Sequence, residues 1–203
     1  MSDRSASSRR VQTLRAHLAG GGGSDCGGDC GSAAACAGPS SSPTSSRIRC
    51  AGNHAMPFEA WKVGQLLETK CRTINDADII NYTHLTGYDA ENLFGDMEYL
   101  RNVAGHKRRL APGLLTASIA DALIVGSGIL EGYAVALVSL NDVVAKAPVY
   151  GGDTLQVLLE VTESKPSKSK PDRGFVTTSQ QVINQDGTVV MEYKVTRLLR
   201  RSK

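Results

Sequence analysis

The sequence predicts an α+β fold in which a mostly antiparallel sheet wraps one long helix. Two observations carry this prediction: a strongly apolar helical stretch in the middle of the chain, and a series of strand-like segments in its C-terminal third. A further strand and two short helices are predicted ahead of the long helix. The expected order is therefore strand, two short helices, long helix and four strands, with the long helix covered by the sheet.

The long central helix is predicted over Leu110 to Gly126. Pro112 is tolerated at a first helical position, and Gly126 suits the C-terminal end of a helix. Only three side chains between these two residues are polar, namely Thr116, Ser118 and Asp121. We therefore expect the helix to be buried on nearly every side. Its length of about 24 Å is too short to cross a bilayer, so no membrane association is expected.

Four segments in the C-terminal third are predicted to be consecutive antiparallel strands, because they are rich in Val, Leu, Tyr and Thr and partly alternate in polarity. They are Tyr133 to Lys146, Thr154 to Glu163, Gly174 to Asn184 and Thr188 to Arg200. Glycines, prolines and polar residues separate them, as is typical of turns. A first strand from about Leu66 to Thr73 completes a five-stranded sheet.

Two short helices are predicted between the first strand and the central helix. The first runs from about Asp78 to Leu85, with Asn75 or Asp76 as its N-cap and Gly87 at its end. The second is expected over residues 96–103. His84, on the first of these helices, is expected to be a partly buried polar residue rather than a ligand.

The first 55 residues differ in composition from the rest of the chain. They contain a GGGGS run, a Ser/Pro cluster and few large apolar residues, so we predict a disordered extension over 1–55 and one folded domain over 56–203. Four of the five cysteines lie in this extension, without a CxxC pair or a zinc-finger histidine spacing, so no metal site is expected. No secretory segment is recognisable, and a cytoplasmic location is expected. An organelle transit segment is the alternative, since the extension contains several arginines and serines but also aspartates.

The net charge of +3 is small, and the basic residues gather in three places: residues 106–109, residues 165–173 and the C-terminal end. We interpret these clusters as solvated loops. Aromatic residues make up only 5% of the chain and no nucleic-acid-binding module is recognisable, so nucleic acid is not an expected partner. A small ligand that carries phosphate groups remains compatible with the basic loops.

Four stretches together identify a family. They cover residues 58–69, 76–100, 110–123 and 147–201, of which the last, with APVYGGDTL followed by a basic loop and an NQDG turn, is the most specific. Over Pro57 to Arg201 the chain resembles the MaoC-like acyl dehydratases, the (R)-specific enoyl-CoA hydratase branch of the hotdog fold. The resemblance implies a hotdog fold, an acyl-CoA substrate and no additional cofactor.

The chemistry that this resemblance implies is the reversible addition of water to the double bond of a trans-2-enoyl thioester. In the family, an Asp and a His in the pattern Asp-x-Asn-Pro-x-His activate the water. A backbone N–H at the start of the central helix polarises the thioester carbonyl, where the helix dipole favours the developing negative charge.

The family pattern is only partly kept in this chain. Asp89 matches the catalytic aspartate, with one extra residue between it and Thr86-Gly87. Glu91 then stands at the Asn position, Asn92 at the Pro position and Phe94 at the His position. The family's general-base histidine is therefore missing.

On the central helix, Gly113 keeps the position that polarises the carbonyl, and Ser118 keeps the serine expected to support the aspartate. The expected catalytic residues are Asp89, Glu91, Gly113 and Ser118. The residues expected to contact the substrate are Phe94, Pro112, Leu114, His106 and Arg109, of which the two basic ones would meet the nucleotide end of CoA.

Three functions compete for this altered site. In the first, Asp89 and Glu91 divide the acid and base roles of a hydratase, as paired carboxylates do when their surroundings separate their pKa values. In the second, the protein binds CoA esters without catalysis, and Phe94 fills the space of the imidazole. The third, thioester hydrolysis, fits the motifs least well. In each case we expect at least a homodimer, because an exposed edge strand favours pairing with a second copy.

Overall fold

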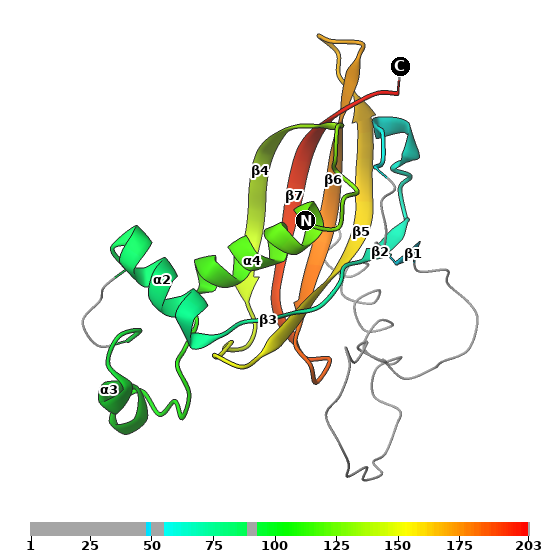
Figure 1. The fold of residues 1–203 in the computed structure, drawn as a ribbon. Coiled ribbons are helices and arrows are strands. Elements are labelled where there is room, and N and C mark those ends of the chain that lie inside the picture. Colours follow the sequence, from blue (N-terminus) through cyan, green and yellow to red (C-terminus); the bar gives the residue numbers. More distant parts are fainter. Residues whose placement is uncertain (1–47, 50–54, 89–92, 203) are drawn as a thin grey trace, which may run out of the picture. The chain divides into compact units, whose positions relative to one another are not determined.

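The computed structural model describes residues 48–49, 55–88 and 93–202. Within these ranges, helix α4 (Gly113–Val125) lies across one face of a mostly antiparallel sheet, as Figure 1 shows. This arrangement confirms the predicted α+β class and the packing of the long helix on the sheet.

The sheet contains the four predicted C-terminal strands, the strand predicted over Leu66 to Thr73 is divided into two short strands, and one further short strand precedes it. Its strands are β1 (Ile48–Arg49), β2 (Leu66–Glu68), β3 (Arg72–Thr73), β4 (Ala134–Ala145), β5 (Thr154–Pro166), β6 (Arg173–Ile183) and β7 (Val189–Arg200). Their order across the sheet is β1-β2-β5-β6-β7-β4, and β3 pairs with β5 beside this path. Every pair is antiparallel except β1 with β2.

The predicted hairpins from β5 to β6 and from β6 to β7 are confirmed, but the expected pairing of β4 with β5 is wrong. Strand β4 pairs instead with β7 and lies at the edge of the sheet. The connection from β4 to β5 follows the segment that leads into α4: the Ala111 N–H donates to the Val149 carbonyl oxygen at 2.8 Å, and Leu110 pairs with Tyr150. These bonds keep residues 146–153 out of a hairpin.

The core lies between α4 and the central strands of the sheet. Strands β5, β6 and β7 alternate buried and less buried residues, as expected when one face of a sheet is covered. The helix contributes six buried side chains: Leu115, Thr116, Ala117, Ile119, Ala120 and Ile124. Burial of this apolar surface is the main force that holds α4 on the sheet.

The prediction that the central helix is buried on nearly every side is wrong. Leu114 is 52% exposed and Val125 is 56% exposed, because the sheet covers only one side of α4. Strand β4 is also open: Leu137 and Leu140 are 56% and 42% exposed. These two residues lie opposite inward-facing residues of β7, so they are on the same face of the sheet as α4. An apolar surface formed by α4 and β4 is therefore uncovered in the described part of the chain.

Two short helices precede α4, as predicted. Helix α2 (Asp76–Thr86) begins at Asn75, whose side chain accepts a hydrogen bond from the Asp78 N–H at 2.9 Å, while the Asp78 carboxylate accepts one from the Asn75 N–H at 3.0 Å. This reciprocal capping box fixes the start of the helix, and Gly87 ends it at a φ of 64°. Helix α3 (Met97–Asn102) follows, with Asp96 as its N-cap. No helix in the described ranges is long and apolar enough to cross a membrane.

Two residues of the predicted extension 1–55 pair with the sheet, and the expected disorder of the extension stays a prediction. Ile48 and Arg49 form β1, which pairs with Leu67 and Glu68 at the edge of the sheet. This pairing supplies backbone hydrogen bonds that composition alone does not reveal. The other residues of the predicted extension, apart from Ala55, lie outside the described residues.

Candidate functional site

The N-terminal end of α4 presents backbone N–H groups at an exposed position. Pro112 is the N-cap and supplies no capping side chain, and Gly113, the first helical residue, is exposed. The first N–H groups of a helix have no partner within the helix and carry the positive end of its dipole. Because the Ala111 N–H donates to the Val149 carbonyl oxygen, this end of the helix is fixed against the connection from β4 to β5. The geometry suits a developing oxyanion.

The surroundings of Gly113 are apolar. A Cβ atom at this position would lie 3.9 Å from the terminal methyl group of Met191, on β7. Leu114 is largely exposed beside it, and Pro112 is buried. Ser118, one turn further along α4, is exposed, and its hydroxyl group donates to the Leu114 carbonyl oxygen at 2.8 Å. Gly113, Leu114 and Ser118 thus lie on one exposed side of the helix.

The predicted proton-transfer residues follow Tyr88. Asp89 and Glu91 lie outside the described residues. The residues on either side of them are in contact: the Tyr88 and Phe94 ring centroids are 5.6 Å apart, and Tyr82 lies 6.3 Å from Tyr88. Phe94, at the position where the family pattern has its histidine, is therefore half-buried in an aromatic cluster.

Arg109 holds the chain next to this cluster. Its guanidinium group donates to the carbonyl oxygens of Phe94 and Gly95, at 2.8 and 3.3 Å, and its Nε lies 3.6 Å from an Asp76 carboxylate oxygen. The Arg109 side chain is only 14% exposed. These contacts give Arg109 a positioning role that the sequence did not suggest, while the predicted contact with CoA stays a prediction.

The neighbouring basic residues also have partners in the fold. The His106 ring nitrogen Nδ1 is 2.9 Å from the Tyr150 hydroxyl group, and Arg108 forms a 2.9 Å ion pair with the buried Asp153. The Arg108 guanidinium group also lies over the Tyr150 ring, at 4.8 Å from its centroid. Residues 106–109 therefore anchor the segment before α4 to the start of β5.

A polar cluster under α4 was missed by sequence reasoning. Asp121 of α4 forms an ion pair with Arg197 of β7, and Tyr193 lies on the same face of β7. Burial, reinforced by the negative charge of Asp121, raises the pKa of the Tyr193 hydroxyl group well above its usual range. The signal available in the sequence was that Asp121 is the one ionisable residue of this helix.

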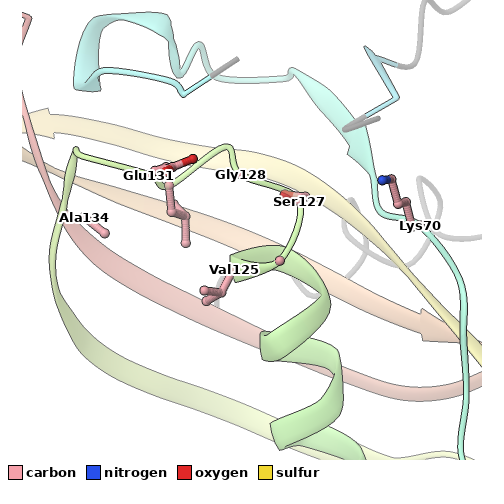
Figure 2. A pocket seen from close by; sticks show the side chains of 8 residues that line it. Lys70, Val125, Ser127, Gly128, Glu131 and Ala134 are labelled. Atoms are coloured by element: carbon pink, nitrogen blue, oxygen red, sulfur yellow. The ribbon is translucent and has the colours of Figure 1, made fainter. Parts of the chain in front are cut away.

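A pocket of about 390 Å³ lies at the opposite end of α4 (Figure 2). Val125, Ser127 and Ala134 contribute to its wall, and the charged residues at its border are Lys70 and Glu131. Val125 is the twelfth residue after Gly113 along the helix, which corresponds to about 18 Å. The pocket is thus distinct from the N-terminal end of α4.

Comparison with known proteins places these features in context. A family model described as "MaoC like domain" matches residues 59–185. A MaoC-like dehydratase from Rhodospirillum rubrum is similar to this chain at 27% identity and a TM-score of 0.63, over 73% of this chain and 99% of that one.

Two further solved structures share the fold. The R-hydratase PhaJ1 from Pseudomonas aeruginosa has 26% identity and a TM-score of 0.60, over 73% of this chain and 88% of that chain. A conserved hypothetical protein from Mycobacterium tuberculosis, which has a double hotdog fold, matches with 20% identity and a TM-score of 0.62, over 73% of this chain and 45% of that one. These likenesses confirm the predicted hotdog fold and the family resemblance.

Proposed function

The chain belongs to the MaoC-like domain family, and on that premise we propose that it is an enoyl-CoA hydratase or acyl-CoA dehydratase. It adds water to, or removes water from, the 2,3 position of an acyl-CoA thioester. Membership of the MaoC-like domain family and the structural likeness to an R-hydratase support this reaction class. The acyl-CoA itself is the substrate, and we propose that no additional cofactor or metal takes part.

The observation that carries the proposal is the uncapped N-terminal end of α4 at Gly113. Addition of water to an enoyl thioester places negative charge on the carbonyl oxygen, and a preorganised N–H group at a helix N-terminus stabilises such charge. Gly113 is exposed and lies beside the apolar Leu114 and Met191. The hydrogen bond between Ala111 and Val149 holds the chain in place just before it. A carbonyl oxygen that accepts from the Gly113 N–H would be polarised in the transition state.

Hydration also needs a group that takes a proton from water and a group that delivers one to the α-carbon. In this proposal Asp89 and Glu91 divide these roles, and Ser118 supports Asp89 through its hydroxyl group. Phe94 has no titratable group, so it contributes only apolar contact with the substrate. Pro112, Leu114, His106 and Arg109 complete the proposed contacts with the acyl-CoA.

We propose that the working unit is a homodimer that acts in the cytoplasm. The open edge of β4 and the exposed apolar residues on β4 and α4 support a second copy as the partner, because an uncovered apolar strand at a sheet edge is prone to pairing. The double hotdog fold of the Mycobacterium tuberculosis protein shows that two hotdog units associate within one molecule there.

One observation favours a second function, the binding of CoA esters without catalysis. Phe94 stands at the histidine position, and its phenyl ring, which packs against Tyr88, has no nitrogen with which to exchange a proton. Thioester hydrolysis, the third function considered from the sequence, has no such observation in its favour.

The test measures the rate at which the purified protein hydrates linear and branched trans-2-enoyl-CoA esters. Calorimetry measures the binding of the same esters. The expected result is hydration by the wild type, and loss of most of the rate in Asp89→Asn with ester binding largely retained. Binding without hydration across the panel would support the non-catalytic function. An Asp89→Asn variant as active as the wild type would contradict the site assignment.

A further inference from the structure

The segment that leads into α4 is paired with the connection from β4 to β5. The Gly151 N–H donates to the Arg109 carbonyl oxygen at 3.0 Å, and two residues further on the Ala111 N–H donates to the Val149 carbonyl oxygen at 2.8 Å. The pairing is antiparallel, and it ends two residues before Gly113. The position of the Gly113 N–H group therefore depends on what holds these two segments in place.

Asp76, the first residue of α2, contacts both segments through one carboxylate group. Its Oδ2 atom is 3.6 Å from the Arg109 Nε. A Cβ atom at Gly151 would lie 1.9 Å from its Oδ1 atom, so only a residue without a side chain lets the carboxylate come this close. The Gly152 N–H donates to the Ile74 carbonyl oxygen at 2.7 Å, which brings the start of α2 to the same place.

The contact between Asp76 and Arg109 adds little to stability. The Asp76 side chain is 60% exposed, and an ion pair that is so open to water contributes little to the free energy of unfolding. The Arg109 Nε atom, in contrast, is buried and has no hydrogen-bond acceptor within the described residues. The Nη1 atom of the same guanidinium group donates to the carbonyl oxygens of Phe94 and Gly95. Asp76 therefore supplies the charge that orients Arg109 on its other side.

Resting on the proposed hydration activity, we propose that Asp76 is a positioning residue for the N–H group of Gly113. Its carboxylate attracts the Arg109 side chain and packs on Gly151, so a shift of the segment before α4 breaks this contact. The direction of the N–H group determines how well it stabilises the charge that develops on the thioester carbonyl oxygen. A misplacement of about 1 Å can cost about 10²-fold in rate. Asp76 acts through Arg109 and Gly151 and takes no part in proton transfer.

The experiment measures kcat and KM for hydration of a trans-2-enoyl-CoA by three single variants of the full chain. Asp76→Asn removes the charge of the carboxylate, and Gly151→Ala displaces the carboxylate while both charged partners stay. Each is expected to lower kcat about tenfold, with KM within about twofold of the wild type. Asp78→Asn is the matched control, because it removes a carboxylate from the same turn of α2 that pairs with Arg72 at 2.9 Å. It should lower only the thermal midpoint.

A double-mutant cycle separates positioning from a purely structural role. In the Gly113→Pro background, which lacks the N–H group, Asp76→Asn is expected to change kcat by less than about twofold. A further loss of about tenfold in that background would overturn the proposal, because the effect would not pass through the Gly113 N–H group. An equal fall of kcat in Asp78→Asn would also overturn it, since the start of α2 as a whole would then be responsible. A raised KM at unchanged kcat would assign the contact to substrate binding instead.

If the wild type hydrates no enoyl-CoA ester, the proposed function fails, and the role of Asp76 is decided without catalysis. Hydrogen exchange of the Ala111 amide then reports the pairing of the segment before α4. Asp76→Asn is expected to raise the exchange rate of this amide about fivefold, while the amides of β6 keep their wild-type rates. Asp78→Asn should leave the Ala111 amide unchanged. An unchanged rate of this amide in Asp76→Asn would overturn the positioning role.

Discussion

At the residue scale, position 94 has the largest chemical consequence. An imidazole can exchange a proton near neutral pH, and the phenyl ring of Phe94 cannot. The ring instead contacts Tyr88, which in turn contacts Tyr82. This contact joins the two ends of the segment that contains Asp89 and Glu91.

The first prediction concerns the substitution Phe94→His. If the reaction is hydration, an imidazole at this position adds a proton-transfer group, so the hydration rate should rise or remain unchanged. The rate of enoyl-CoA hydration at several pH values measures the effect. A clear fall in rate, with the thermal midpoint retained, would show that position 94 is not equivalent to the histidine of the family pattern.

Arg109 gives a second prediction at this scale. Arg109→Met removes the hydrogen bonds to the Phe94 and Gly95 carbonyl oxygens, so the free energy of unfolding should fall by about 1–3 kcal/mol. Denaturant unfolding measures this change, and calorimetry with a CoA ester serves as the second readout. Weaker ester binding at unchanged stability would instead assign Arg109 to the substrate, as the sequence suggested.

At the scale of the elements, the short 3-10 helix η1 (Phe58–Ala60) packs on β6, and the Phe58 ring lies against Gly174. A Cβ atom at Gly174 would lie 2.3 to 2.6 Å from atoms of the Phe58 ring, which is closer than atoms in contact can approach. Phe58 is buried, and Arg201 lies over its ring at 5.5 Å from the centroid. Only a residue without a side chain permits this packing.

Gly174→Ala should therefore destabilise the fold by about 1–3 kcal/mol, since the Phe58 ring must move. Urea unfolding measures the loss. Gly113→Ala is the matched control for stability, because a Cβ atom there meets Met191 at an ordinary contact distance of 3.9 Å. Equal unfolding midpoints for the two variants would contradict the contact between Phe58 and Gly174.

The elements also show how far the sequence could be interpreted. Strand alternation and turn residues located the strands, and Asn75 and Gly87 located α2, because these signals are local. The position of β4 at the sheet edge depended on bonds between the segments around Ala111 and Val149, which no local pattern contains. The sequence did not reveal the exposed side of α4. Hydrophobic periodicity does not distinguish an apolar face that is buried within the same chain from one that is buried against another chain.

The positions of some candidate site residues were predictable from the sequence, but their contacts were not. Gly113 and Ser118 were located from the family motif, and both lie on the exposed side of α4. The partners of Arg109 and Arg197 were not predictable, because each pairing joins residues that are far apart in the sequence. Asp89 and Glu91 lie outside the described residues, so their roles stay predictions.

At the scale of the whole molecule, α4 and β4 form an apolar surface that no other described element covers. Leu137 and Leu140 are exposed on the α4 side of β4, and Val138 is 49% exposed on the same strand. Antiparallel pairing of β4 with β4 of a second copy would bury these residues and extend the sheet.

Leu140→Lys should therefore shift the protein from dimer to monomer at micromolar concentration, because a charge on an edge strand opposes pairing. Sedimentation velocity measures the two species. Val63→Lys replaces an exposed apolar residue of a turn and should leave the dimer intact. A wild-type protein that sediments as a monomer would remove the basis of the proposed interface.

The central claim is that the Gly113 N–H at the start of α4 polarises an acyl thioester, and Gly113→Pro tests it most directly. Proline is tolerated at a first helical position, so the variant loses the N–H and keeps the helix, whereas Gly113→Ala keeps both. The measurement is kcat for hydration of a trans-2-enoyl-CoA. We expect Gly113→Pro to be slower than Gly113→Ala by about 10²- to 10³-fold, with similar thermal midpoints. Equal rates for the two folded variants would contradict the account.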